Sequence, residues 1–413
     1  MTSKDRFQRP MKFARIVARW CILSVIMGTV GGLLGTVFHH ALHFVTHVRS
    51  EHMWLIFFLP LGGLLTAAIY RHPKMKGNKG TNEIIEATLD GHPVGSMVAP
   101  SIFLATAITH LFGGSAGREG AALQLGGSAA SMLARLFHLK ESNRKILITA
   151  GMSAVFAGLF GTPLTATLFC IEFASVGTML SPALLPCFLS AFTASRISLA
   201  LGVHPETHMI TQVFSMTLNT SWRYMILAVL VSLLGILMCT VFHKAEHLAS
   251  HHLPNPFLRI VIGGAVVTAM TLLVGDHRFN GAGMEMALNA VSGESDWYSF
   301  ALKMLFTAVT LAAGFKGGEI VPTFCIGATF GCVLGGLLGL DAGMAAALGL
   351  IGLFCCATNS PFASIMLSVE MFGGTNIHLF AFVCVICFVL SGNYGLYASQ
   401  ILQYNKADML GEF

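Results

Sequence analysis

Residues 113–120, Gly-Gly-Ser-Ala-Gly-Arg-Glu-Gly, interrupt an apolar region and lead into the helical pattern of residues 121–136. A glycine-rich turn before a helix leaves backbone N–H groups free and presents the positive end of the helix dipole, and both attract anions. Glu119 places a carboxylate where such an anion would bind. Because a protonated carboxyl group is neutral and free to leave, this site would link anion occupancy to proton occupancy. The alternative is a helix N-cap or first-turn acid, but an ionisable residue within apolar sequence is costly, which favours the gating role.

A second glycine-rich turn repeats the first one further along the chain. Residues 314–322 read Gly-Phe-Lys-Gly-Gly-Glu-Ile-Val-Pro, and the block at 317–320 lies at an offset of 200 from the block at 117–120. We expect the backbone N–H groups near Glu319 and Ile320 to face the same cavity as the first turn. Glu319 is then either a proton carrier or a first-turn acid that only stabilises its helix, and the sequence leaves both interpretations open.

Two further blocks recur with nearly the same spacing. Residues 36–43 (TVFHHALH) return as residues 240–247 (TVFHKAEH) at an offset of 204, and residues 162–164 (TPL) return as residues 360–362 (SPF) at an offset of 198. Three blocks in the same order at nearly one offset indicate two homologous halves. In membrane transporters, such halves place a substrate site at their interface near the membrane midplane.

The predicted organisation follows from these halves. It comprises a basic cytoplasmic N-terminal segment (1–20), a first membrane repeat (21–201), a linker (202–222), a second membrane repeat (223–402) and a cytoplasmic C-terminal tail (403–413).

Composition places the chain in a membrane. Of its 413 residues, 54% are hydrophobic and 10% are charged, and the mean hydropathy is +0.73. A soluble domain carries about 25% charged residues, so a soluble, disordered, collagen-like or disulfide-scaffold protein is excluded. Several apolar segments are shorter than the roughly 20 residues of a full span and end in glycine or proline, which is typical of broken helices that line a cavity. We therefore predict an all-α polytopic membrane protein.

The net charge of +5 follows a membrane rule and does not indicate a nucleic-acid partner. Six basic residues against one acid crowd positions 1–20, and four more lie in the loop 71–79. The positive-inside rule places both segments in the cytoplasm. The first twenty residues are too charged for a signal peptide. We predict a multi-pass protein of the cytoplasmic membrane, surrounded by lipid, with cytoplasmic N- and C-termini.

Two histidine-rich stretches and ten cysteines raise the question of metal binding. The histidines of residues 39–47 and 243–252 share helix faces, but both groups fall at the ends of apolar spans, where such side chains reach toward the membrane interface. The cysteines, including the pair Cys384 and Cys387, lie mostly in apolar sequence and are interpreted as core thiols. We expect no metal site and no cofactor.

For three remaining residues, the sequence allows either a structural or a chemical role. Glu172 and Glu370 end matching apolar helices in the two halves, and structural hydrogen bonding is favoured for both. Ser115 fits the Gly-x-Ser-x-Gly pattern of a serine hydrolase, but that pattern requires a preceding strand, which an all-helical chain lacks. We therefore do not expect an enzyme.

The two glycine-rich turns resemble motifs of the CLC family of anion channels and proton-coupled antiporters. Residues 117–120, followed by Gln124 and Gly126, resemble the family's G-R-E-G-P-x-x-Q-x-G motif, and residues 317–322 resemble its G-G-x-F-x-P motif. The resemblance covers nearly the whole chain. It implies a CLC-type fold of two inverted repeats with broken and tilted helices, and a homodimer with a separate anion pathway in each subunit.

The resemblance also assigns roles to particular residues. It makes Glu119 the gating glutamate and Tyr397 the tyrosine that faces the anion. Residues 77–83 stand where chloride-type members carry G-S-G-I-P, so Thr81 and Asn82 are the nearest equivalents of the anion-contacting serine.

Other departures indicate a branch of the family. Phe173 stands where chloride-type antiporters carry a second, internal glutamate, and Glu319 stands where they carry an apolar residue. This pattern is similar to the CLC fluoride/proton antiporters, in which Glu319 would belong to the proton pathway. Ala121 and Val321 depart from the proline and threonine of the respective motifs.

The sequence therefore predicts fluoride export driven by proton uptake, with Glu119 and Glu319 as the proton-carrying residues. The expected anion-binding residues are Gly117, Arg118, Gly120, Thr81, Asn82, Gly318, Ile320, Val321 and Tyr397. A chloride or broad-specificity CLC transporter or channel is the alternative, followed by an unrelated inverted-repeat carrier.

Overall fold

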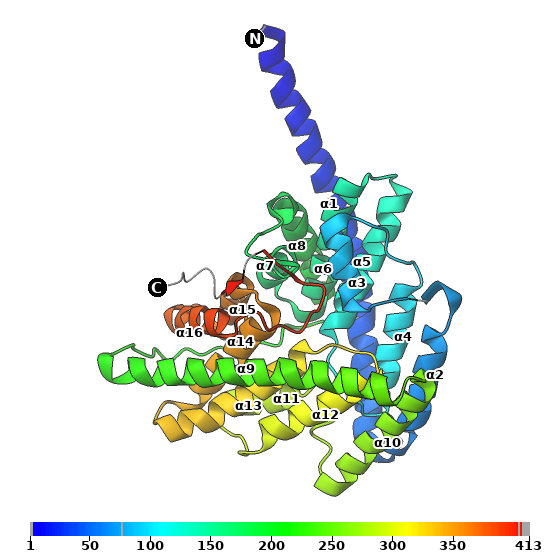
Figure 1. The fold of residues 1–413 in the computed structure, drawn as a ribbon. Helices are drawn as coiled ribbons and strands as arrows, with labels where there is room; N and C mark the ends of the chain where they lie inside the picture. Colours follow the sequence, from blue (N-terminus) through cyan, green and yellow to red (C-terminus); the bar gives the residue numbers. More distant parts are fainter. Residues whose placement is uncertain (1–2, 76, 404, 407–413) are drawn as a thin grey trace.

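The computed structural model describes residues 3–75, 77–403 and 405–406, so most of the predicted C-terminal tail lies outside the described residues. Apolar helices account for almost all of the ordered structure, as predicted (Figure 1). The α-helices are α1 (Ser3–Glu51), α2 (Leu59–Tyr70), α3 (Thr81–Asp90), α4 (Val98–Leu111), α5 (Glu119–Leu136), α6 (Glu141–Phe160), α7 (Pro163–Glu172), α8 (Leu184–Ala200), α9 (Leu218–His252), α10 (Pro256–Val274), α11 (Met284–Val291), α12 (Ser299–Ala313), α13 (Ile320–Leu338), α14 (Ala342–Thr358), α15 (Pro361–Phe372) and α16 (Ile377–Leu390). Three 3-10 helices, η1 (Met53–Phe58), η2 (Pro73–Met75) and η3 (Ser181–Ala183), and the strands β1 (Ser175–Val176) and β2 (Ile401–Leu402) complete the described part of the chain.

Helix lengths divide the fold into full spans and shorter pieces. Within the described residues, six helices are long and apolar enough to cross a membrane, α1, α9 and α13 among them. Six other apolar helices have only 10–17 residues. Among these short helices, α7 and α15 have their N-terminal N–H groups bonded by carboxylates of the other half.

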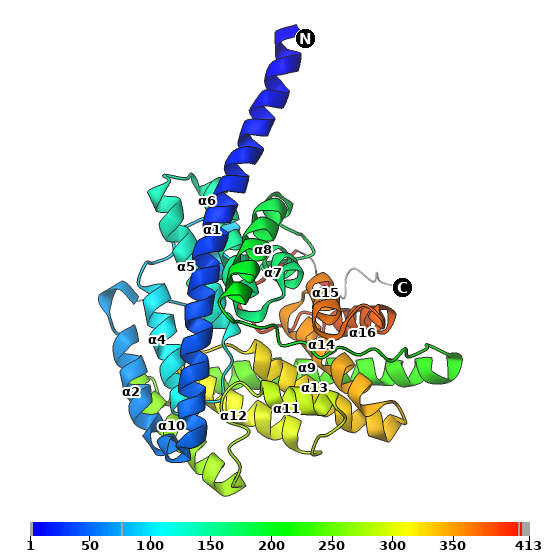
Figure 2. The same cartoon turned by 180° about the vertical axis from the view of Figure 1, so that it is seen from behind.

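Helix α1 runs across residue 20, where the sequence predicted a boundary between the basic segment and the first membrane repeat. It continues without a break from Ser3 to Glu51, and its N-terminal part extends beyond the body of the molecule (Figures 1 and 2). The basic segment and the first span are thus one helix. The predicted linker also differs slightly, because α9 begins at Leu218.

The two halves pack as matching sets of helices. In the first half α5 packs along α6, and in the second half α13 packs along α14. Glycines allow these close contacts: a Cβ on Gly126 would lie 2.2 Å from the carbonyl oxygen of Gly151, and one on Gly327 would lie 2.4 Å from that of Gly349. Helices α5 and α13 meet between the halves, so their N-terminal ends lie together at the centre of the fold.

A pair of glutamates joins the halves at a second place. The Glu172 carboxylate accepts hydrogen bonds from the backbone N–H groups of Phe362 (3.1 Å) and Ala363 (2.8 Å), at the start of α15. Reciprocally, the Glu370 carboxylate accepts from Leu164 (3.0 Å) and from a second N–H at the start of α7. Each acid occupies the positive end of the partner helix dipole. The structural role predicted for these residues is confirmed.

Candidate functional site: two glycine turns around a carboxylate

The two glycine-rich turns are bonded directly to each other. The N–H of Gly117 donates to the carbonyl of Gly318 (2.6 Å), and the N–H of Gly318 donates to the carbonyl of Gly117 (2.8 Å). This antiparallel bridge fixes the beginning of α5 against the beginning of α13. As a result, two helix N-termini, one from each half, point their free N–H groups into one place.

The side chain of Glu119 occupies that place. Its Oε2 accepts hydrogen bonds from the backbone N–H of Val321 (3.2 Å) and from that of Arg118 (3.1 Å). Glu119 is fully buried, and its Oε1 has no hydrogen-bond partner among the described residues. The carboxylate therefore binds the N-terminus of α13 in the other half as well as its own turn. This contact distinguishes it from an ordinary first-turn acid.

Thr81 lies directly beside this turn. A Cβ on Gly120 would lie 3.0 Å from the Thr81 hydroxyl, and Gln124 on α5 donates to the same hydroxyl over 3.3 Å. Gly120 is thus in contact with the start of α3 on one side and with Gly317 on the other. The structure brings Thr81 to the Glu119 turn, as the sequence predicts.

Asn82 contacts the C-terminal segment instead of the turn. Its Oδ1 accepts from the backbone N–H of Ser399 (3.0 Å). Nearby, the Glu86 carboxylate accepts from Lys79 (2.8 Å) and from the Ser399 hydroxyl (2.8 Å). The hydrogen bond from Lys79 is the main cause that lowers the pKa of Glu86 and keeps it charged. Helix α3, which is not a spanning helix, is therefore fixed to the segment that carries Tyr397.

Tyr397 and Glu319 both present polar atoms without a partner. The ring of Tyr397 packs edge-on against Phe173, with centroids 5.7 Å apart, and the residue is 6% exposed. Among the described residues, neither the Tyr397 hydroxyl nor the Glu319 Oε2 has a hydrogen-bond partner, although both atoms are buried. Buried polar atoms are nearly always paired with protein or water. Unpaired groups near Glu119 fit a site that takes a small hydrated ligand.

The side chain of Arg118 points away from this turn, and only its backbone N–H reaches Glu119. Its guanidinium forms an ion pair with Glu206 (2.6 Å) and contacts the Phe160 ring. Both Arg118 and Val321 line a cavity of about 860 Å³, which therefore reaches the N-terminus of α13.

Lys303 is a buried cation that the sequence analysis did not single out. Its Nζ donates to the Ser115 hydroxyl (3.0 Å) and to the carbonyls of Gly281 (2.6 Å) and Phe279 (3.2 Å). The only signal in the sequence is a lone lysine within the apolar segment 300–313. Lys303 holds the first glycine turn through Ser115. Since Ser115 is fully buried and bonded to a lysine and a threonine, its surroundings do not resemble those of an accessible nucleophile.

The histidine stretches contact protein groups near the helix ends. His40 on α1 bonds the carbonyl of Leu201 (3.0 Å), and His243 on α9 bonds that of Leu396 (3.2 Å). In both halves a histidine thus fastens a long helix to the segment that follows the last helix of its repeat. No group of three potential metal ligands occurs in the part of the chain that the structure describes.

Gly318 has no space for a side chain. An added Cβ would lie 2.7 Å from the backbone nitrogens of Glu119 and Gly120 and from the Glu119 carboxylate. We expect Gly318→Ala to push the two turns apart, at a cost of about 1–3 kcal/mol, and to reduce anion flux through reconstituted protein at least about tenfold. Gly336→Ala, on the helix α13 that follows this turn and with nothing within 4 Å of an added Cβ, is the matched control. Equal fluxes in the two variants would contradict the tight contact.

Comparison with known proteins agrees with this geometry. The family model of voltage-gated chloride channels matches residues 62–392. The chain belongs to this family, the CLC family. The predicted family and fold are confirmed, and CLC proteins are transporters or channels, not enzymes.

Individual CLC proteins are similar over most of their length. A chloride/fluoride channel protein of Pseudomonas syringae pv. tomato is 32% identical over 97% of this chain and 91% of its own length. An H+/Cl− exchange transporter of Vibrio parahaemolyticus is 24% identical over 94% of this chain and 90% of its own. The crystal structure of a CLC-type fluoride/proton antiporter is 32% identical, with a TM-score of 0.91, and the match covers 94% of this chain and 98% of that one.

Proposed function

We propose that this protein exchanges fluoride for protons across a cytoplasmic membrane. The observation that carries the proposal is the position of the Glu119 carboxylate, an anion bound to the N-terminal N–H groups of α13. An external anion needs the same donors. The carboxylate therefore competes with the anion while it is charged, and it releases the donors when a proton neutralises it.

Glu319 supplies the second proton position. It stands at the N-cap of α13, two residues before Val321, whose N–H bonds Glu119, and it has a buried, unpaired oxygen. A proton that moves between Glu119 and Glu319 remains next to the anion site throughout. Phe173 stands where an internal glutamate would otherwise offer a different proton path, so Glu319 takes that role in this proposal.

Fluoride is the proposed anion, with chloride as the alternative. Fluoride is small, strongly hydrated and a strong hydrogen-bond acceptor, so several well-aimed N–H donors must replace its hydration. The two joined glycine turns present such donors at close range. Two relatives support fluoride as the anion. One is named a chloride/fluoride channel protein, and the other is a CLC-type fluoride/proton antiporter of known structure.

The proposal includes a homodimer with one pathway in each subunit. Glu119, Thr81, Val321 and Tyr397 all come from a single chain, so a complete pathway needs no residue from a second copy. The expected orientation has both termini in the cytoplasm, with the basic residues of the first twenty positions on that side.

Ion-selective electrodes test this function directly. Purified protein is reconstituted into liposomes loaded with either fluoride or chloride, and efflux is followed with and without an inward proton gradient. We expect the inward proton gradient to accelerate fluoride efflux, with a rate at least about tenfold above that of chloride. Equal efflux rates for both anions favour the chloride or broad-specificity alternative. An efflux rate that is the same with and without the proton gradient rules out proton-coupled exchange.

A further inference from the structure

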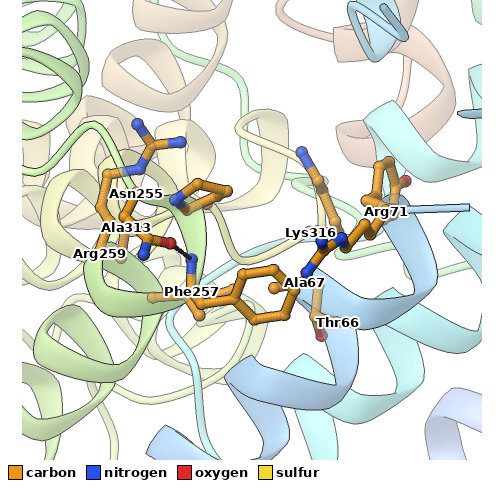
Figure 3. Close-up of a pocket in the computed structure, with 12 residues that line it drawn as sticks. Thr66, Ala67, Arg71, Asn255, Phe257, Arg259, Ala313 and Lys316 are labelled. Carbon is orange, nitrogen blue, oxygen red and sulfur yellow. Dashed lines mark hydrogen bonds between the residues drawn. The ribbon is translucent and has the colours of Figure 1, made fainter. Parts of the chain in front are cut away.

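A second cavity, separate from the one that Arg118 and Val321 line, carries an unusual concentration of positive charge. It has a volume of about 560 Å³ and lies between the C-terminal end of α2, the N-terminal end of α10 and the loop that precedes α13. Arg71, Arg259 and Lys316 line it (Figure 3). Arg259 lies on one side of the pocket, and Lys316 and Arg71 lie on the other (Figure 3).

These three cations form no ion pair among the described residues, although the carboxylates of Glu246 and Glu319 are close enough to interact electrostatically with Lys316. No carboxylate of the described chain lines the pocket, and none lies within 4.0 Å of the three side chains. Instead, Lys316 lies over the ring of Tyr70 at 4.6 Å, and Arg71 lies over the ring of Phe257 at 5.6 Å. Aromatic faces hold cations in place but leave their N–H donors available.

Buried polar atoms around the pocket are also unpaired. Within the described chain, the Thr66 hydroxyl, the Tyr70 hydroxyl and the Arg259 Nε are buried without a hydrogen-bond partner. Thr66 is only 1% exposed. Buried polar groups normally have partners. Three cations, one of them with an unpaired Nε, and two unpaired hydroxyls in one cavity together indicate a missing ligand with several acceptor oxygens, as in a phosphate group.

The helices that wall the pocket expose apolar stripes beside it. On α2, Leu61 and Leu65 are 52% and 51% exposed. On α10, Leu258, Ile262 and Val266 are 50%, 39% and 41% exposed, and their spacing of four places them on one face. Helix α10, and α2 together with the preceding η1, are long and apolar enough to span a membrane. An acyl chain can lie along these faces while its headgroup enters the pocket.

We propose that this pocket binds the phosphate of an acidic phospholipid headgroup. A basic pocket between spanning helices is the kind of site that recognises such headgroups. Free phosphate offers the same oxygens, but the adjoining apolar stripes give the lipid additional contacts that the free ion lacks. Lys316 belongs to the turn that carries Glu319, so a bound headgroup contacts the segment from which α13 begins.

Native mass spectrometry of the detergent-purified protein tests the proposal, with phosphatidylglycerol and phosphatidylcholine as probes. We expect wild type to retain phosphatidylglycerol in preference to phosphatidylcholine. We expect R71Q/R259Q to retain at least about tenfold less phosphatidylglycerol than wild type. R71K/R259K keeps the charges and is expected to keep much of the binding. K12Q/K74Q removes two exposed basic side chains outside the pocket and is expected to behave like wild type.

Three outcomes overturn the proposal. The first is equal phosphatidylglycerol retention by wild type and R71Q/R259Q, with both eluting as the same folded species in size exclusion. The second is an equal loss in K12Q/K74Q, which would mean general surface charge. The third is competition of inorganic phosphate with phosphatidylglycerol at equal concentrations, because the pocket would then bind the free ion and not the lipid. None of these readouts depends on anion transport, so they remain valid if the proposed exchange function fails.

Discussion

Glu119→Gln protein is expected to lose proton transport, with proton flux lowered about a hundredfold, the scale on which a positioned acid–base side chain contributes. The glutamine has nearly the same shape and still offers one oxygen to the N–H of Val321, which now bonds the carboxylate at 3.2 Å. It carries no charge and cannot take up or release a proton. An anion therefore no longer competes with a carboxylate for the N-terminus of α13, and anion movement is no longer linked to protons.

The measurement combines two electrodes on the same liposomes, one for fluoride and one for pH. Glu141→Gln is the matched control, because Glu141 is also the first residue of a helix in the same half but is exposed. The control is expected to keep wild-type coupling. If Glu119→Gln protein still drives fluoride efflux with an inward proton gradient, Glu119 is not the proton carrier and the proposed mechanism is wrong.

The sequence was sufficient to predict what depends on local pattern and repetition. Glycine-rich turns before helical sequence predicted two anion-attracting helix starts, and the offset near 200 placed them in equivalent positions of two halves. The matching positions of Glu172 and Glu370 favoured a structural hydrogen-bonding role, although their reciprocal partners are seen only in the structure. These features repeat in the sequence itself, so no knowledge of long-range contacts was needed.

Features that depend on side-chain direction or on three separate segments could not be predicted. Arg118 was expected at the anion site, but its guanidinium turns to Glu206 in the inter-repeat linker, which has no recognisable motif. Asn82 was expected to bind the anion, yet its side-chain oxygen bonds Ser399, over 300 residues later. Short apolar helices tolerate several packings, and only the folded arrangement determines which polar groups meet.

Lys303→Met is expected to lower the free energy of unfolding by about 2–4 kcal/mol, the largest stability effect among the variants considered. Methionine has a similar length and fills the space, but it cannot donate. The carbonyls of Gly281 and Phe279 and the hydroxyl of Ser115 each lose the bond that Lys303 now provides at 2.6–3.2 Å. All of these groups are enclosed by protein, so water does not readily replace the lost donor.

Two further variants test whether Lys303 stabilises the fold through its three hydrogen bonds together. Ser115→Ala removes one of the three acceptors and is expected to cost about 1 kcal/mol, whereas Lys244→Met, at an exposed position on α9, is expected to change stability by less than about 0.5 kcal/mol. Chemical denaturation in detergent gives all three values. Equal stability of Lys303→Met and Lys244→Met would show that the buried bonds contribute nothing. If Lys303→Met is the least stable of the three variants, Lys303 fixes the loop of Gly281 to the turn of Ser115. Because Ser115 lies four residues before Glu119, this link sets the position of the carboxylate that the proposed exchange requires.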